Sequence, residues 1–189
     1  IMSYSLGLVY NSANRDSYFS QMGDIHTGNF STMALGMGWK LTAQETVVPI
    51  SVEDQGTTET YLVYNDSDGT EHYFKQSDSD STLYEDEDGL NLTIKKDSST
   101  QYTMTDKKDN QKIFTSGYLT AVKDANGNQV GIVYNNGNGI NTSSGNRITS
   151  ITVQPKDGTA DTIFVINYDD STNLVSGVED KYGTTYKFV

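Results

Sequence analysis

The sequence predicts an all-β protein built from antiparallel hairpins, and three observations support this. No window of ten or more residues places apolar side chains at helical spacing among good helix formers. Apolar residues instead alternate with polar ones, as they do in strands with one buried face. Asp-Gly and Asn-Gly dipeptides separate these runs, and such pairs tolerate the positive φ angles that tight hairpin turns require.

The alternating runs predict strands in chain order. They contain Tyr4-Leu6-Leu8-Tyr10, Leu90-Leu92-Ile94, Val130-Ile132-Tyr134, Ile148-Ile151-Val153 and Ile163-Val165. Reversals of the chain are predicted at Asp68-Gly69, Asp88-Gly89, Asn126-Gly127 and Asp157-Gly158. Only two prolines occur, Pro49 and Pro155, which suits strands whose backbone N–H groups are all needed for pairing.

The turns recur in an Asp-x-x-Gly pattern with a nearly constant spacing. The aspartates at positions 66, 86, 106 and 124 follow one another at intervals of 20, 20 and 18 residues, with Asp109 in place of glycine in the third turn. Such a period predicts hairpin repeats that bury their faces by stacking on their neighbours. The repeat-pattern residues are Asp66, Gly69, Asp86, Gly89, Asp124, Gly127, Tyr168, Asp169, Asp180 and Gly183.

This pattern predicts one module over residues 1–189. Residues 59–189 form an array of hairpins of about 20 residues each, arranged as one extended or curved sheet. Residues 1–58 form an irregular N-terminal cap with the first strands. The Gly/Asn/Ser-rich stretch from Asn135 to Asn146 is expected to be a long loop. The chain finishes within an alternating pattern, so we interpret it as a fragment of a larger protein.

Composition excludes several classes of function. Lys+Arg number 13 and Asp+Glu 25, giving a formal net charge of −12, and this charge repels nucleic acid and anionic membrane surfaces. The absence of cysteine excludes disulfides, thiolate metal sites and a cysteine nucleophile. No apolar run is long enough to span a membrane, so we expect no membrane insertion. The 13 tyrosines are expected to supply much of the core.

Two segments resemble the repeat of the rearrangement-hotspot (Rhs, or YD-repeat) family. Residues 168–186, beginning with Tyr168-Asp169, look like one copy, and residues 117–135 look like a second. Asn135 stands where the family has aspartate. Residues 8–12 and 36–41 resemble the segment that precedes the repeats in secreted, wall-associated Rhs-type proteins.

The resemblance implies a non-enzymatic structural or adhesive module of a large exported bacterial protein. It implies a place outside the cell or in the cell wall, with the repeats forming part of a shell around a C-terminal toxin. The expected partners are flanking domains of the same chain and a glycan or cell-wall polymer. No cofactor is expected.

Calcium is the metal that the sequence favours most, if a metal is bound. The candidate ligands are Asp78, Asp80, Asp86 and Asp88, which lie in a segment without Lys or Arg. An EF-hand loop needs a glycine at its sixth position and an acidic ligand at its twelfth. When the glycine of any Asp-Gly turn is placed sixth, the twelfth residue is not acidic, so an EF-hand is excluded. A solvated acidic loop explains the same residues better.

Two further classes of function stay open as alternatives. A carbohydrate-binding module would use Trp39 as a stacking platform, although a single tryptophan beside Leu41 is more often a core residue. A glycoside hydrolase would need two carboxylates that meet in space, and no pair is singled out. His26 and His72 are the only imidazoles, and neither lies in a catalytic pattern, so no catalytic residue is predicted.

Overall fold

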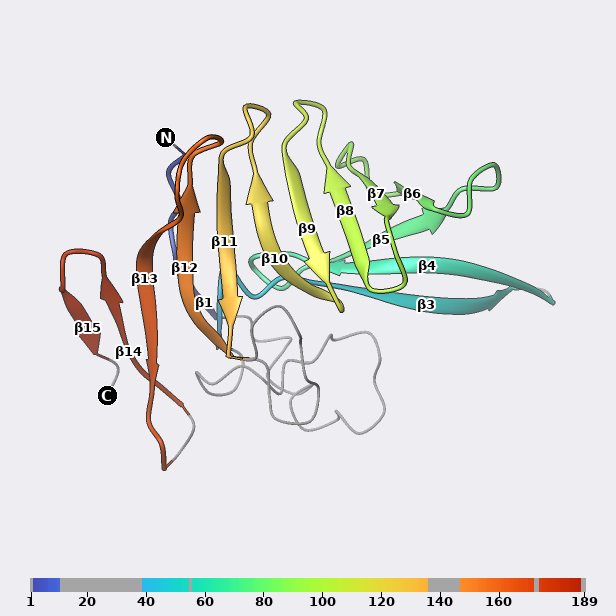
Figure 1. Cartoon of the computed structure of the whole chain (residues 1–189). Helices are drawn as coiled ribbons and strands as arrows, with labels where there is room; N and C mark the ends of the chain where they lie inside the picture. Colours follow the sequence, from blue (N-terminus) through green and yellow to red (C-terminus); the bar gives the residue numbers. More distant parts are fainter. Residues whose placement is uncertain (1, 11–38, 55, 136–146, 172–173, 188–189) are drawn as a thin grey trace.

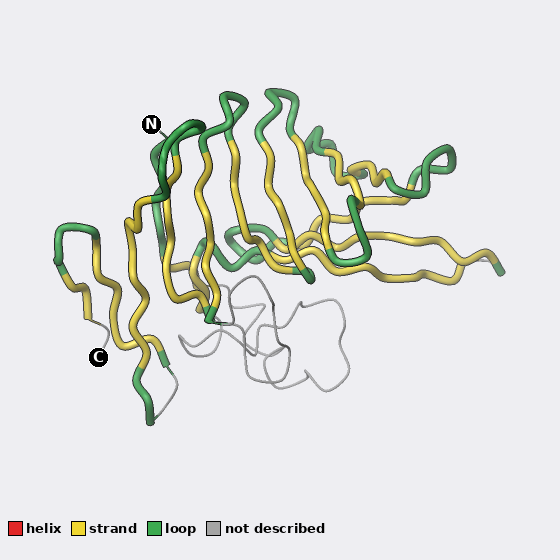
Figure 2. The backbone as a smooth tube through the Cα atoms, in the orientation of Figure 1, coloured by secondary structure: helices red, strands yellow, loops and turns green. Residues whose placement is uncertain are grey.

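The computed structural model describes residues 2–10, 39–54, 56–135, 147–171 and 174–187 as strands joined by turns (Figures 1 and 2). This part of the chain contains no helix, and so no helix that could cross a membrane. The strands are β1 (Leu8–Tyr10), β2 (Trp39–Leu41), β3 (Thr46–Asp54), β4 (Thr57–Asn65), β5 (Glu71–Gln76), β6 (Leu83–Asp86), β7 (Thr93–Lys96), β8 (Gln101–Thr105), β9 (Gln111–Thr115), β10 (Tyr118–Lys123), β11 (Gln129–Tyr134), β12 (Ile148–Gln154), β13 (Asp161–Tyr168), β14 (Val175–Asp180) and β15 (Thr185–Lys187).

The all-β prediction is confirmed, and every strand pair in the described ranges is antiparallel. From β3 to β9 each strand pairs with the next one in the chain, and β10 then pairs with β9. The same neighbour-to-neighbour order continues from β10 to β15. β1 and β2 form a separate two-stranded sheet.

The prediction of one open sheet is wrong, because the eight strands β3 to β10 close into a barrel. The start of β10 pairs with the start of β3, where Tyr118 lies opposite Thr46. Two backbone bonds make this seam: Val47 N–H to the Gly117 carbonyl (2.8 Å) and Leu119 N–H to the Glu45 carbonyl (3.0 Å). Sheets of many twisted strands tend to curl, and here the curl brings together residues that are far apart in the chain.

A bulge in β10 lets one strand serve both the barrel and the remaining sheet. The register with β9 shifts between Leu119 and Ala121, and a bulge of this kind bends the strand. The beginning of β10 therefore lies between β9 and β3, while its end, from Ala121 to Lys123, lies between β9 and β11. Strands β11 to β15 extend away from the barrel, and we call them the extension (Figure 1).

One apolar core runs through both parts. In the barrel, alternate strand positions bury Leu62, Phe74, Ile94 and Phe114 completely. In the extension, the core continues with Val130, Ile132, Tyr134, Ile148, Ile151, Ile166, Val175 and Val178. Met2, Tyr4 and Leu6, before β1, pack against this core. Several tyrosines are core residues, as expected, since Tyr64, Tyr84 and Tyr134 are each at most 4% exposed.

The barrel seam depends on a glycine in a left-handed conformation. Gly117 has φ +90°, and a Cβ at this position would lie 3.2 Å from the Val47 carbonyl oxygen. We expect Gly117→Ala to lower the free energy of unfolding by about 1–3 kcal/mol, from backbone strain and this close approach together. Urea titration checks the value.

The matched control is Gly89→Ala, because Gly89 has φ +79° but a Cβ added there would meet nothing within 4 Å. The control measures the backbone strain alone. Equal losses for the two variants would contradict the role we give to the seam contact.

Candidate functional site

The Asp-x-x-Gly turns form a row along the sheet, because they join every second strand pair, and Figure 1 shows the turns after β8 and β10 side by side. In the turn after β10, the Asp124 carbonyl accepts the Gly127 N–H at 2.9 Å. One carboxylate oxygen of Asp124 also accepts the N–H groups of Asn126 and Asn128, both at 2.9 Å. The aspartate therefore closes the turn twice, through its backbone and through its side chain.

The same geometry recurs in three other turns of the row. The carboxylates of Asp66, Asp106 and Asp180 each accept the N–H groups two and four residues later. The fourth turn residue has a positive φ in each, and Asp109, which replaces glycine in the second of these turns, has φ 61°. Aspartate is one of the few residues besides glycine that adopts this conformation readily.

Two other predicted repeat positions differ in detail. Asp86 accepts the Asp88 N–H at 2.8 Å and the Asn91 N–H at 2.7 Å, in a turn where Gly89 has a positive φ. Asp169 accepts the N–H and the hydroxyl of Ser171 at 2.9 and 2.6 Å. The Tyr168 hydroxyl donates to the Ile148 carbonyl at 2.8 Å, so Tyr168 connects β13 with β12.

Two asparagines that the sequence reasoning missed connect neighbouring turns, and we call these contacts the turn ladder. Asn128 donates from Nδ2 to Asp124 at 2.7 Å, and its Oδ1 accepts the Lys156 N–H of the next turn at 3.3 Å. Asn110 likewise donates to Asp106 at 2.8 Å and accepts the Ala125 N–H at 3.3 Å. The signal is Asp-x-x-x-Asn, shared by residues 106–110 and 124–128.

A second cluster of polar side chains joins the start of β3 to β4 and β9. The Tyr64 hydroxyl donates to Glu45 Oε2 at 2.6 Å, and Lys112 Nζ lies 2.6 Å from that oxygen and 2.7 Å from the Tyr64 hydroxyl. Burial, followed by the nearby Glu45 charge, raises the pKa of Tyr64 above its ordinary value. The three groups satisfy one another, as in a structural ion pair in which Glu45 is buried and Lys112 is partly exposed.

Lys40 extends this cluster from β2. Its side chain is fully buried, and Nζ donates to the Asp66 carbonyl. Burial lowers the pKa of Lys40 to about 8, while the nearby Glu45 charge opposes the shift. The amine is therefore much closer to its neutral form at neutral pH than an exposed lysine.

His72 lies beside this cluster, between two carboxylates. Nε2 is 3.1 Å from Asp66 Oδ2, and Nδ1 is 3.4 Å from Asp88 Oδ2. The imidazole thus joins the turn after β4 to the turn after β6. His26 lies outside the described residues.

The proposed calcium ligands are spread over separate turns. Asp80 accepts the N–H and the hydroxyl of Thr82 at 2.8 and 2.7 Å, which uses one of its oxygens to form a turn. Asp78 is exposed, and Asp86 and Asp88 lie at the end of β6 and in the turn after it. Within the described ranges, no three acidic or histidine side chains come together as a metal site would require.

Trp39 is not a core residue. Its side chain is 42% exposed, and its ring lies 5.3 Å from that of Tyr10, which is 47% exposed. The two residues face each other across β1 and β2. They form an exposed aromatic pair that is suited to stacking on the apolar face of a ligand ring.

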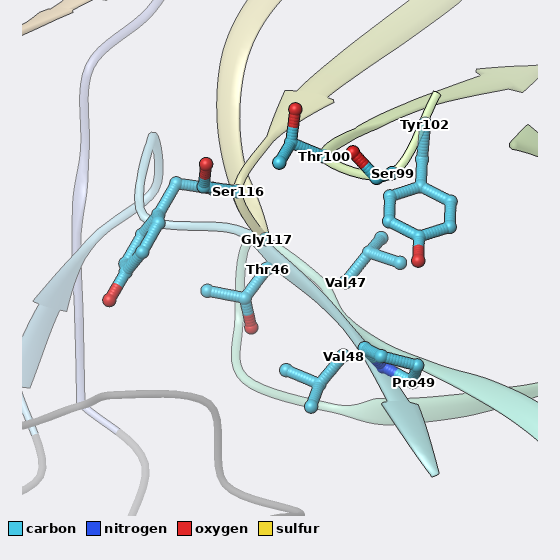
Figure 3. Close-up of a pocket in the computed structure, with 10 residues that line it drawn as sticks. Thr46, Val47, Val48, Pro49, Ser99, Thr100, Tyr102, Ser116 and Gly117 are labelled. Carbon is cyan, nitrogen blue, oxygen red and sulfur yellow. The ribbon is translucent and has the colours of Figure 1, made fainter. Parts of the chain in front are cut away.

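A cavity of about 310 Å³ lies beside the barrel seam (Figure 3). It is lined by Thr46, Val47, Val48, Pro49, Ser99, Thr100, Tyr102, Ser116, Gly117 and Tyr118. None of these residues carries a charge. Nothing in the sequence alone marked this set, because its members come from β3, β8, β10 and two turns.

A scan against protein-family models and a search of the curated proteins found no match to this chain.

The turn ladder predicts a loss of stability on Asn128→Ala. This change removes the side-chain bonds to Asp124 and to the Lys156 N–H but keeps the backbone bond to Asp124, so we expect the free energy of unfolding to fall by about 1–2 kcal/mol. Thr184→Ala is the control, because Thr184 holds the same position after Asp180 and bonds its carboxylate through the backbone N–H. An equal loss in both variants, measured by urea titration, would contradict the ladder.

The buried amine predicts an unusual pH dependence. Between about pH 8 and the ordinary lysine pKa of 10.5, unfolded Lys40 holds a proton that folded Lys40 has released. The free energy of unfolding should therefore rise with pH in this window. Above about pH 10 it should fall, because burial raises the pKa of Tyr64 and Tyr134, so the unfolded tyrosines release protons first.

Urea titrations from about pH 7 to about pH 11 test whether the free energy of unfolding first rises and then falls, as the buried lysine and tyrosines predict. In Lys40→Met the rise should disappear, while the fall at high pH should remain. A wild-type profile that stays flat across the window between the folded and unfolded lysine pKa values, or an unchanged rise in the variant, would contradict the assignment to Lys40.

Proposed function

We propose that this chain is a non-enzymatic structural or adhesive module of a large exported bacterial cell-surface protein of the Rhs/YD-repeat type. The observation that carries the proposal is the turn ladder, in which Asn110 and Asn128 each bond their own turn to the next one. Bonds of this kind stabilise the stacking of consecutive hairpins and do not shape a reaction site.

The extension supports a role in contact with neighbouring modules. Its core face becomes more exposed toward β15: Ile166 is 4% exposed, Val178 8% and Tyr186 58%. These three residues lie on one face, since Ile166 pairs with Val178, and Val178 pairs with Tyr186. A core face that continues uncovered to the last described strand is suited to a further strand or a neighbouring module.

The charge distribution supports a hydrated outer surface. The row of turns carries Asp66, Asp86, Asp106, Asp124 and Asp180, whose carboxylates are bonded to their own turns. Hydration of such a surface favours a stable shell or a wall-associated scaffold, and it disfavours polyanions as partners.

A carbohydrate-binding module is the second candidate, and the exposed Tyr10–Trp39 pair favours it. A sugar stacked there would depend on the indole, so its affinity would be lost on Trp39→Ala. A glycoside hydrolase stays a more distant alternative, because the buried carboxylate of Glu45 is bonded to Tyr64 and Lys112.

Sedimentation velocity over a range of concentrations tests the proposed role of the open edge. We expect the chain to self-associate through β15, and Tyr186→Lys to weaken this about tenfold, because lysine is a natural blocker of edge strands. Tyr182→Lys is the matched control, since Tyr182 is 82% exposed but lies in the turn before β15. A strict monomer at high concentration, or equal effects of both variants, would count against the edge.

A further inference from the structure

Closure of the barrel leaves most of β3 without a second neighbouring strand. β10 pairs with β3 only at Thr46, whereas β4 pairs with β3 over its whole length. In the described part of the chain, no strand lies beside residues 48–54 on the side away from β4. Figure 1 shows the ends of β3 and β4 projecting to one side of the barrel. We call residues 48–54 the β3 edge.

The β3 edge offers a short stretch of backbone groups for pairing. Val47 donates its N–H to the Gly117 carbonyl across the seam at 2.8 Å. Alternate residues of a strand direct their backbone groups to the same side, so Pro49, Ser51 and Glu53 face the open side. Proline has no N–H, so only Ser51 and Glu53 offer both a donor and an acceptor there. The stretch that can pair fully is therefore three residues long.

β15 is an open edge of the same length, three residues. The Thr184 carbonyl accepts the Asp180 N–H at 2.9 Å, so the backbone groups of Thr184 face β14. By alternation those of Tyr186 also face β14, while those of Thr185 and Lys187 face the open side. β15 thus offers two residues with a donor and an acceptor, as the β3 edge does.

We propose that β15 of one copy of this chain pairs antiparallel with the β3 edge of a second copy, so that copies associate head to tail. The pairing that uses all the outward backbone groups places Thr185 opposite Glu53 and Lys187 opposite Ser51. Antiparallel pairing is also the arrangement of every strand pair in the described ranges.

The side chains of the two edges are complementary in this register. Tyr186 lies opposite Val52, and these residues are 58% and 41% exposed in the single chain. An aromatic residue opposite a β-branched one stabilises a strand pair. On the other face Lys187 lies diagonally from Glu53, whose carboxylate accepts the Thr58 hydroxyl at 2.5 Å within its own hairpin. Opposite charges in such positions attract each other.

Pairing of two identical edges is less favourable. Two β15 strands centred on Tyr186 would place the Lys187 side chains of both copies diagonally to each other. Two β3 edges centred on Val52 would do the same with Glu53. Like charges repel in both cases, whereas the head-to-tail pairing joins a lysine to a glutamate. That attraction matters in a chain with a formal net charge of −12, whose copies repel each other at long range.

This inference rests on the self-association through β15 proposed above, and it names the surface that β15 binds. A contact of three residues in each strand is small, so we expect weak association that requires a high protein concentration. Because the two edges of one copy differ, each added copy presents a new open edge, and association continues beyond the dimer.

Sedimentation velocity of two edge variants and of their mixture tests the pairing. Val52→Lys should weaken self-association about tenfold, as we expect for Tyr186→Lys, because each variant blocks one edge and keeps the other. An equimolar mixture should form dimers and no larger species, since β15 of the Val52→Lys chain still fits the β3 edge of the Tyr186→Lys chain. Recovery in the mixture also shows that both variants are folded.

Thr57→Lys is the matched control, because it adds the same charge to the exposed start of β4, the other strand of the same hairpin. Equal weakening by Thr57→Lys, or a mixture with no more dimer than either variant alone, would overturn the head-to-tail pairing. A Val52→Lys chain that associates like the wild type, while Tyr186→Lys does not, would also overturn it and leave β15 to pair with itself. A wild-type chain that stays monomeric would overturn both this pairing and self-association through β15.

Discussion

The short contact between the starts of β3 and β10 determines how the rest of the molecule is arranged. Two backbone bonds, from Val47 to Gly117 and from Leu119 to Glu45, turn a row of hairpins into a closed barrel. The same contact places Glu45 beside Tyr64 and Lys112, and it forms one wall of the neutral cavity. The bulge that follows in β10 releases the later strands into the extension. Barrel, buried charges, cavity and extension thus depend on one seam.

Local features of the fold could be predicted from the sequence because they depend on neighbouring residues. Alternation in Val130, Ile132 and Tyr134 indicates a strand with one buried face, and these residues are buried in β11. Asp124 and Gly127 indicate a turn, and the carboxylate and the positive φ of the glycine explain why. Such signals act over a few residues, so a single sequence is enough to reveal them.

Closure of the barrel could not be predicted, because it joins Thr46 to Tyr118, which are far apart in the chain. A bulge in β10 sets the point at which the barrel closes. The partly buried Glu45–Lys112 pair spans 67 residues and follows from that closure. The seam cavity likewise collects hydroxyls from segments that share no pattern in the sequence. Trp39 shows a different limit: its apolar neighbour Leu41 suggested a core position, but Leu41 is 2% exposed while Trp39 is 42% exposed. In a strand, burial depends on what covers a face, and the sequence around Trp39 does not record that.

The two ends of the large sheet differ in how far they are closed. At one end β3 and β10 close the barrel, but they pair only at Thr46, so residues 48–54 of β3 keep an open side within the described part of the chain. At the other end β15, the last described strand, keeps an open side along its whole length. Closure thus protects only the start of β3, and a further strand can pair with the projecting part of β3 as well as with β15. The same short seam that closes the barrel leaves the molecule with an edge for growth at each end of the sheet.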